Sequence, residues 1–580
     1  MSYARSNISL LSLSSYRQFP RTSIPTRLFP TSAAVPLRRL SVCKSSAAAP
    51  PSPPPTSNVS AALLQTPLSP SERREYLLEK TASKLQRISG SSSEKLKLID
   101  EIQRLGIGYY FKDAIDTLLR VQCTAFAPEE DLFVTSLRFR LLRHAGFHVS
   151  PEVLLKFKGK SGKFEEALSG DTVGLLSLYE ASHVGGEGEE LLEEAMKFSE
   201  SCLRRSLLAE VAPRVRDEVA GALETPRHMR MGRLEARRFI EEYSKQSGHD
   251  EELLELATLD YNRVQAQHQM ELTEITRWWK QLGLVNKLSF ARDRPLECFL
   301  WTVGLLPDPK YSDCRIEAAK TIAILLVIDD IFDTYGEMGD LTLFTHAIQR
   351  WDLEAMETLP EYMKICYMAL YNTTNEICYR VLKDSGRTVL PFLKATWIDM
   401  IEGFMVEAKW FNGGKGPNLE EYIENGVSTA GAYMAFVHLF FLIGEGVNDQ
   451  NMPLLSHKPY PNLFSAAGRI LRLWDDLGTA KEEQDRGDLS SSIPLFMKEN
   501  KLTEEEARSR VLEEIFRLWK DLNGELISEN KVLPLPIIKV ALNMARASQV
   551  VYKHDHDTYF SSVDNYVEAL FFTPLPPSKF

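Results

Sequence analysis

Cysteine is scarce in this chain, and its spacing excludes two classes of protein. The 580 residues include seven cysteines, an odd number, and no two of them are spaced as Cys-x-x-Cys. A disulfide-stapled secreted domain or a zinc site needs paired cysteines at short spacings. We therefore expect reduced cysteines that pack in the interior of a protein from a reducing compartment.

Long hydrophobic runs and strand patterns are also missing. The longest apolar stretch, about residues 431–444, is too short to span a bilayer and carries His438. No segment sustains the alternation of a strand, whereas amphipathic windows such as 189–198 recur to about residue 270, separated by Gly, Pro or Ser breaks. The sequence predicts an all-α, soluble protein without a membrane span.

Acidic residues are absent from the first 71 positions, which are rich in Ser, Thr and Pro. This composition is typical of an organelle transit peptide and lacks the apolar centre of a secretory signal; plain disorder is the alternative. We predict a transit peptide over 1–45, a disordered linker over 46–65 and a destination in the plastid (chloroplast) stroma. The segment contains seven basic residues: Arg5, Arg17, Arg21, Arg27, Arg38, Arg39 and Lys44. Without them the formal net charge of -11 becomes about -18, which argues against a nucleic-acid partner.

Three aspartates interrupt an apolar helical pattern at residues 321–336. Asp329, Asp330 and Asp333 follow the run Thr-Ile-Ala-Ile-Leu-Leu-Val-Ile. On an α-helix, Asp329 and Asp333 lie one turn apart on one face, about 6 Å along the axis, while Asp330 points about 100° away. A carboxylate that leaves water needs a cation, and two oxygen donors on one face suit Mg²⁺. The alternative is a solvated helix end before Gly336.

A second row of oxygen ligands occupies residues 475–483. Asp475, Thr479 and Glu483 recur every four residues, so they share one stripe of a helix. The stripe continues into Arg472 and its neighbours are apolar, which argues against the alternative of a charged solvent face. Two oxygen-ligand helices in one chain indicate a clamp that holds a polyanion through divalent ions. A diphosphate is the best candidate.

Arginines accompany both acidic rows. Arg292 and Arg294 precede the first row by some 35 residues, and Arg472 lies beside the second. A guanidinium is always charged and its planar fork matches phosphate oxygens, so it stabilises a departing anion. Each arginine alone is more often a surface residue, and only the three together with the two acidic rows indicate a diphosphate site.

These motifs resemble those of the plant terpene synthases. The Asp-Asp-x-x-Asp motif corresponds to 329–333, the second metal motif to 475–483 and the Arg-x-Arg element to 292–294, and Trp301 lies 28 residues before the first aspartate. The resemblance covers nearly all of the chain after about residue 60. It implies an all-α protein with an N-terminal α-barrel-like domain, 66–275, and a catalytic class I terpenoid synthase α-bundle, 276–580.

The resemblance also implies the roles of the metal and diphosphate ligands. Two Mg²⁺ ions bind Asp329 and Asp333, with Mn²⁺ as a substitute, and Asp475 is the first ligand of a third ion. That ion's other ligands are Thr479 and Glu483. Arg292, Arg472 and, further out, Arg294 contact the diphosphate, which metal binding makes a good leaving group.

The resemblance further implies the residues that surround the allylic cation. The cation needs a dry pocket with electron-rich aromatic walls, for which Trp301 and Tyr552 are the candidates. Ordinary core aromatics are the alternative for both. Tyr552 and Asp557 belong to a loop near the mouth of the family's active site, where a Tyr/Asp pair handles protons.

One departure from the family pattern bears on the product. Many cyclising relatives have twin arginines followed eight residues later by a tryptophan, which caps the site; here Arg73 and Arg74 are present, but position 83 is Ser and no tryptophan precedes Trp278. This resembles the subgroup that makes acyclic products. Position 491, a diphosphate-binding lysine in some relatives, is Ser.

The expected enzyme is a carbon-oxygen lyase that acts on geranyl diphosphate. Its expected product is an acyclic monoterpene, either a linalool-like alcohol or an ocimene- or myrcene-like olefin. A nerolidol-type synthase acting on farnesyl diphosphate is the first alternative. A prenyl-elongating transferase is the second, although Thr479 and Glu483 replace the second aspartate motif that it needs. A helical relative without turnover is the third. We expect a monomer, with a dimer as the alternative.

Overall fold

The computed structural model describes residues 69–87, 91–123, 126, 130–208, 212–413, 416–486, 491–553 and 559–577. Contacts between residues divide the chain into two units, Met1–Ser69 and Pro70–Phe580. Helices make up the ordered elements of the described part of the second unit, and one isolated β-bridge joins Lys158 to Phe164. The all-α prediction is confirmed. The transit peptide and linker predicted over 1–65 lie outside the described residues.

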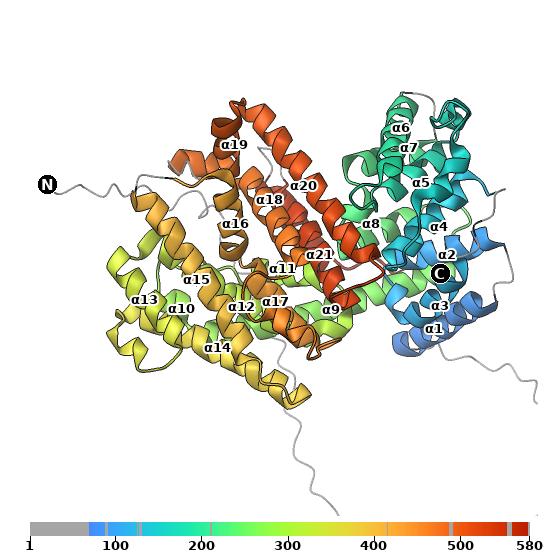
Figure 1. The fold of residues 1–580 in the computed structure, drawn as a ribbon. Helices are drawn as coiled ribbons and strands as arrows, with labels where there is room; N and C mark the ends of the chain where they lie inside the picture. The colour runs from blue at the N-terminus through green and yellow to red at the C-terminus, as the bar shows by residue number, and fades with distance from the viewer. Residues whose placement is uncertain are drawn as a thin grey trace, which may run out of the picture. The chain divides into compact units, whose positions relative to one another are not determined.

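The first half of the second unit runs from blue to green in Figure 1. Its helices pack around one apolar core, to which α4, α5 and α9 contribute many of the fully buried side chains. The helices are α1 (Pro70–Arg87), α2 (Ser92–Arg104), α3 (Lys112–Gln122), α4 (Leu132–His144), α5 (Thr172–Ser182), α6 (Glu190–Ser206), α7 (Pro213–Glu224), α8 (Gly232–Tyr243) and α9 (Glu251–Leu282).

The second half runs from green to red and has two apolar cores of its own. Its helices are α10 (Leu284–Lys287), α11 (Pro295–Leu305), α12 (Ser312–Asp330), α13 (Met338–Arg350), α14 (Glu361–Ser385), α15 (Leu390–Gly413), α16 (Leu419–Thr429), α17 (Ala432–Ile443), α18 (Asn462–Arg486), α19 (Ser492–Asn500), α20 (Glu504–Ile527), α21 (Leu535–Tyr552) and α22 (Tyr559–Val567).

Short helical turns connect the longer helices. Two are π turns, η6 (Ile331–Tyr335) and η9 (Glu568–Phe572). The others are 3₁₀ turns: η1 (Gly108–Phe111), η2 (Pro151–Phe157), η3 (Glu166–Gly170), η4 (Arg227–Met229), η5 (Pro309–Tyr311), η7 (Ala355–Thr358) and η8 (Met452–Leu455).

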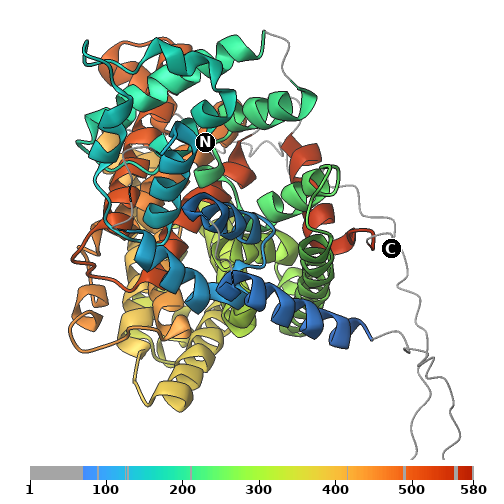
Figure 2. The same cartoon turned by 90° about the vertical axis from the view of Figure 1, so that its right-hand side faces the viewer.

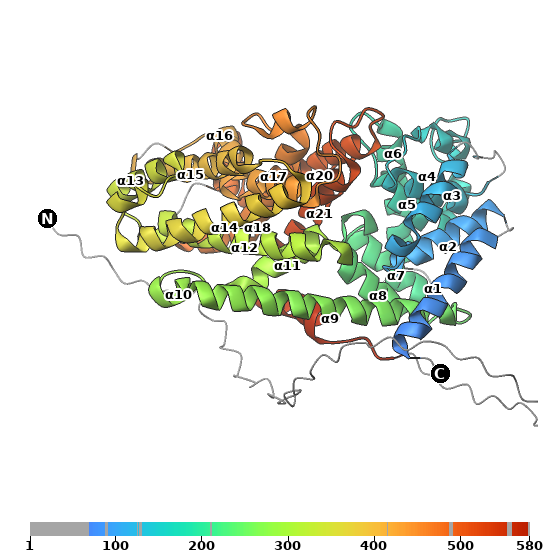
Figure 3. The same cartoon turned by 90° about the horizontal axis from the view of Figure 1, so that it is seen from below.

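Helix α9 connects the two halves. It begins at Asp250, whose carboxylate accepts hydrogen bonds from two backbone amides of the first turn, and it ends at Gly283 in the left-handed conformation. Figure 3 shows it running beneath both halves; it packs against α1 and α8 at one end and against α11 and α12 at the other. The predicted boundary at 275/276 therefore falls inside a continuous helix. In Figure 2 the blue helices α1 to α3 face the viewer.

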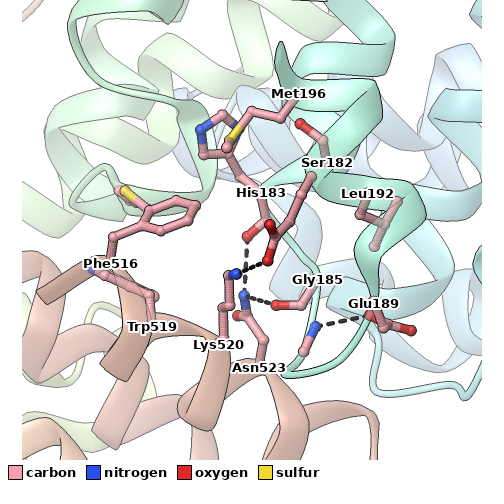
Figure 4. Close-up of a pocket in the computed structure, with 13 residues that line it drawn as sticks. Ser182, His183, Gly185, Glu189, Leu192, Met196, Phe516, Trp519, Lys520 and Asn523 are labelled. Atoms are coloured by element: carbon pink, nitrogen blue, oxygen red, sulfur yellow. Dashed lines mark hydrogen bonds and ion pairs between the residues drawn. The ribbon is translucent and has the colours of Figure 1, made fainter. Parts of the chain in front are cut away.

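A buried polar network also joins the halves. The side-chain amide nitrogen of Asn523 on α20 donates hydrogen bonds to the backbone carbonyls of His183 (3.0 Å) and Gly185 (2.9 Å), as Figure 4 shows. The side-chain oxygen Oδ1 of Asn523 must then accept a hydrogen bond from His228 Nε2, which is 2.7 Å away. This fixes the tautomer of His228, whose Nδ1 accepts from Nε2 of His144 at 3.0 Å. Both histidines are consequently held neutral inside the protein.

The apolar stretch at residues 431–444 forms α17 in the interior. Among the described residues, one segment is long and apolar enough to cross a membrane: Leu419–Ile443, which comprises α16, α17 and the two residues between them. Its most apolar window is 78% buried inside the protein, and a helix that is hydrophobic on all sides is typical of a protein core. Burial therefore accounts for its composition.

Candidate active site

Helix α12 is buried on nearly all sides and carries the first acidic row at its end. It packs against α9, α11, α14 and α17, which explains why its sequence is apolar along most of its length. The α-helix ends at Asp330, and the chain continues as the π turn η6, closed by a hydrogen bond of 2.7 Å from Gly336 N to Ile331 O. The prediction of one regular α-helix through Asp333 is therefore wrong at its end, where a π turn replaces the last α-helical turn. Such turns are frequent at functional sites.

The three aspartates of this row have different surroundings. Asp330 is buried, and it accepts hydrogen bonds from the backbone N of Arg292 (2.8 Å) and pairs with its Nε (2.7 Å). Asp329 is half-buried and also pairs with the Arg292 guanidinium, whereas the side chain of Asp333 is exposed. Asp329 and Asp330 therefore share the guanidinium of Arg292, and Asp330 also holds the backbone of the loop that carries this arginine.

Arg292 and Arg294 have different partners: Arg292 pairs with the first acidic row, and Arg294 pairs with a neighbour on α11. The pairing of Arg292 with Asp329 and Asp330 raises the pKa of its guanidinium despite burial. Arg294 Nη1 instead pairs with Glu297 in the first turn of α11, at 2.9 Å. The diphosphate contact of Arg294 stays a prediction.

Helix α18 presents the second row. Arg472 Nη1 pairs with Asp475 at 2.9 Å. The adjacent Asp476 is fully buried, where it accepts hydrogen bonds from Tyr422 Oη (2.8 Å) and Ser492 N (3.0 Å). The hydroxyl of Thr479 donates to the carbonyl of Asp475 at 2.8 Å. Glu483 lies on the same helix, but its side chain is outside the described residues. Asp475 therefore faces the site while Asp476 anchors the helix.

The carboxylates of α12 and α18 lie within electrostatic range of each other. The charge of Asp329 raises the pKa of Asp475, and the charge of Arg472 lowers that of Asp333. Helix α17 packs against both α12 and α18, so it connects the two helices that carry the ligands. The two acidic rows therefore lie near each other, and the metal clamp that they are expected to form stays a prediction.

Trp301 and Tyr552 lie together beside the second row. Their ring centroids are 5.9 Å apart and the rings are tilted by 54°. Both side chains are half-buried, and a hydrogen bond from Tyr552 to Asp475 lowers the pKa of that carboxyl group. The end of α21 can approach α18 because residue 478 is Gly; a Cβ there would be 2.7 Å from the carbonyl oxygen of Tyr552. The predicted proton-handling residue Asp557 lies outside the described residues.

One further carboxylate in the site, Glu407 on α15, was not predicted from the sequence. It accepts hydrogen bonds from Thr429 Oγ1 (2.8 Å) and Asn425 Nδ2 (3.0 Å). Thr429 Oγ1 in turn accepts a hydrogen bond of 3.4 Å from Arg472. Burial and, to a smaller extent, the charge of Asp329 raise the pKa of Glu407 to about 7 against the opposing effect of Arg472. The run 401–408 contains two carboxylates, Glu402 and Glu407, and nothing in the sequence distinguishes the one that joins the site.

Ionisation of the carboxylates in the site costs free energy. Burial raises the pKa of Asp330 and of Asp475 to about 6. Although the side chain of Asp333 keeps contact with solvent, partial desolvation and repulsion from Asp329 and Glu407 raise its pKa above its ordinary value. Arg292 and Arg472 offset this excess of negative charge only in part. Additional cations would lower the electrostatic energy of the folded protein.

The donor set fits a divalent hard cation. Among the described residues, no three Asp, Glu, His or Cys side chains converge closely enough to hold a metal by themselves. Mg²⁺ binds through one or two carboxylates and completes its shell with water and phosphate oxygens. Separate acidic rows that face one another suit that mode of binding.

Comparison with known proteins decides the family. Residues 57–223 match "Terpene synthase, N-terminal domain", and residues 280–521 match "Terpene synthase family, metal binding domain". The chloroplastic geraniol synthase of Ocimum basilicum is 75% identical over 505 residues, which cover 87% of this chain and 88% of that protein. The chain belongs to the terpene synthase family.

Two further similarities extend the comparison. The chloroplastic R-linalool synthase of Ocimum basilicum is 71% identical over 506 residues, which cover 87% of each chain. Isoprene synthase from grey poplar leaves, solved with three Mg²⁺ ions and dimethylallyl-S-thiolodiphosphate, superposes with a TM-score of 0.83 at 36% identity, covering 88% of this chain and 98% of that one. The resemblance drawn from the sequence motifs is confirmed, as are the two helical domains and the enzyme class. The protein is a terpene synthase with a metal-binding catalytic domain.

Proposed function

We propose that this terpene synthase ionises geranyl diphosphate and releases diphosphate and an acyclic monoterpene alcohol. This assignment rests on the proximity of the acidic rows of α12 and α18. Asp329 lies close enough to act electrostatically on Asp475, and Arg292 and Arg472 pair with these two carboxylates. Two facing acidic rows with arginines suit a ligand that is itself a polyanion coated with cations.

The protein's own groups have separate tasks in this reaction. Arg292 and Arg472 bind the diphosphate oxygens and stabilise the charge that develops as the carbon-oxygen bond breaks. Magnesium bound by the aspartates would neutralise the diphosphate and make it a good leaving group. We propose three Mg²⁺ ions, with Mn²⁺ as a substitute; the grey poplar isoprene synthase structure, with its three Mg²⁺ ions, supports that number.

The cation that remains is proposed to lie beside Trp301 and Tyr552. Their faces are electron-rich and stabilise positive charge, and their ring centroids are 5.9 Å apart next to Asp475. A water molecule then forms a carbon-oxygen bond at C1 or C3 and loses one proton to a base, with Asp557 as the proposed group. Attack at C1 gives geraniol and attack at C3 gives linalool. The names of the two Ocimum basilicum relatives match these two outcomes.

The acyclic outcome has a second support in the sequence. The twin arginines at 73 and 74 lack the tryptophan that follows them in many cyclising relatives. Arg73 instead pairs with Glu255 on α9 at 2.6 Å, so α1 is fastened to the N-terminal half. Without a tryptophan cap, we propose that water reaches the cation before an internal double bond of the substrate reacts with it.

The setting of the enzyme is proposed on the same grounds. The acid-free segment 1–45 is proposed to direct the chain to the plastid stroma, in line with the chloroplastic relatives. The mature chain is proposed to act as a monomer with domains 66–275 and 276–580.

Product analysis tests this function. The purified protein, with Mg²⁺, is incubated separately with geranyl and farnesyl diphosphate, and the volatiles are separated on a chiral gas-chromatography column. Geraniol or linalool from geranyl diphosphate, lost in Asp329→Ala, is the expected result. Mainly cyclic hydrocarbons, or nerolidol from farnesyl diphosphate with no turnover of geranyl diphosphate, would overturn the proposal.

A further inference from the structure

Three aromatic rings from separate segments meet at the edge of the first acidic row. Phe290, in the loop before α11, stacks on Tyr335 at the end of η6, with centroids 4.1 Å apart and planes 15° apart. Tyr362, in the first turn of α14, meets Tyr335 edge to face at 5.0 Å and Phe290 at 6.2 Å. We refer to these three residues as the aromatic clamp.

The exposure of Tyr335 distinguishes this cluster from an ordinary core. Tyr335 is 52% exposed, so hydrophobic burial explains its position only in part. Stacked and edge-to-face pairs at these distances are favourable beyond the area they bury. Tyr362 is anchored by a hydrogen bond of 3.3 Å from its hydroxyl to Asp340 on α13. The clamp therefore ties two short segments to a fixed support.

Those two segments carry groups of the proposed diphosphate site. Phe290 lies two residues before Arg292, and Tyr335 lies two residues after Asp333. A π turn and a loop have fewer backbone hydrogen bonds to fix them than the middle of a helix has. A group misplaced by about 1 Å can cost about a hundredfold in rate, so both segments need support from side chains.

We propose that the aromatic clamp holds the Arg292 loop and the Asp333 turn in register, so that both groups engage the same diphosphate. Phe290, Tyr335 and Tyr362 are thus positioning residues, which act through Arg292 and Asp333 without touching the substrate. This inference rests on the proposed function, since it concerns the grip on the diphosphate of a prenyl substrate.

Tyr335→Ala is the direct test, and Tyr335→Phe is its matched partner because it keeps the ring and removes only the hydroxyl. Tyr379→Ala is the control, since Tyr379 is 68% exposed on α14, the helix that carries Tyr362. Phe290→Leu removes the other ring of the stacked pair while keeping an apolar side chain. Each variant is assayed for kcat and KM with geranyl diphosphate, for binding of inorganic diphosphate with Mg²⁺ by calorimetry, and for Tm.

We expect Tyr335→Ala and Phe290→Leu to weaken diphosphate binding about tenfold and to lower kcat/KM by about 10- to 100-fold, with Tm nearly unchanged. Tyr335→Phe should behave like the wild type, as should Tyr379→Ala. Wild-type diphosphate binding in Tyr335→Ala would overturn the inference, as would a Tyr335→Phe variant as impaired as the alanine variant. A wild-type protein that binds diphosphate but turns over no prenyl diphosphate would refute the proposed function, while the calorimetric comparison would still test the clamp.

Discussion

Asp475→Asn should stabilise the metal-free protein while it removes the response to metal. The carboxyl group of Asp475 is half-buried, and burial raises its pKa from 3.8 to about 6 even with Arg472 beside it. At pH 8 the group is ionised in both the folded and the unfolded chain. Since one pKa unit corresponds to about 1.4 kcal/mol, keeping this charge costs the folded state about 3 kcal/mol.

The neutral amide of Asp475→Asn removes the cost of the buried charge but forms a weaker hydrogen bond with Arg472. A charged hydrogen bond contributes about 1.5–3 kcal/mol, so of the gain of about 3 kcal/mol we expect about 0–1.5 kcal/mol to remain for the variant. With an unfolding entropy near 2.1 cal/mol/K per residue over about 500 residues, 1 kcal/mol corresponds to about 1 °C. The Tm in chelator should therefore rise by up to about 1.5 °C.

Mg²⁺ should reverse the order of the two proteins. A ligand at 100 times its Kd stabilises a fold by about 2.7 kcal/mol, so saturating Mg²⁺ and diphosphate should raise the Tm of the wild type by several degrees. The variant lacks one carboxylate of the second row and should respond less. Turnover of geranyl diphosphate should fall by at least about a hundredfold.

Scanning calorimetry at pH 8, in EDTA and in Mg²⁺ with diphosphate, measures both effects. Asp449→Asn is the control, because Asp449 also pairs with an arginine, Arg387, but its side chain is 93% exposed; it should change neither Tm nor the metal response. A Tm of Asp475→Asn below that of the wild type in EDTA, or an unchanged response to Mg²⁺ and diphosphate, would refute the electrostatic account of the site.

Three other predictions concern Glu407 and the network between the halves. Glu407→Gln should lower kcat/KM by about 10- to 100-fold and raise the Tm in EDTA, because the pKa of that carboxyl group is raised to about 7; unchanged kinetics would exclude it from the site. Burial and the charges of nearby arginines, Arg140 and Arg546 among them, lower the pKa of His144 and His228 well below 6.5, so stability present above pH 6.5 should be lost on acidification, by about 1.4 kcal/mol per histidine at pH 5.5. His144→Gln, which keeps a donor to His228, should weaken this pH dependence of Tm, and an equally steep profile would contradict the assignment. Asn523→Ala leaves two carbonyls and one imidazole without partners and should cost about 2–4 kcal/mol with diphosphate affinity unchanged in calorimetry; a weakened affinity would link the network to the active site.

The positions of the motifs along the sequence predicted much of the site. The spacing of Asp475, Thr479 and Glu483 placed three ligands on one helical stripe, and all three lie on α18. Local periodicity succeeds at these positions because a helix fixes the directions of its side chains.

Other features depend on contacts that one sequence does not encode locally. The π turn at η6 inserts one residue within a run that reads as a regular α-helix. Glu407 joins the site only because α15 packs against α16, which carries Asn425 and Thr429. Arg294 has the spacing of a diphosphate ligand but pairs with Glu297. Tertiary packing brings Glu407 into the site, whereas Arg294 is drawn to a carboxylate only three residues further along the chain.

The metal dependence of diphosphate release tests the central claim most directly. Purified protein is mixed with geranyl diphosphate in Mg²⁺ or in excess EDTA, and inorganic diphosphate and volatile product are quantified in the same samples. The two facing acidic rows predict one diphosphate released per volatile alcohol formed in Mg²⁺, and neither product in EDTA. Equal rates of release with and without the chelator would contradict the account.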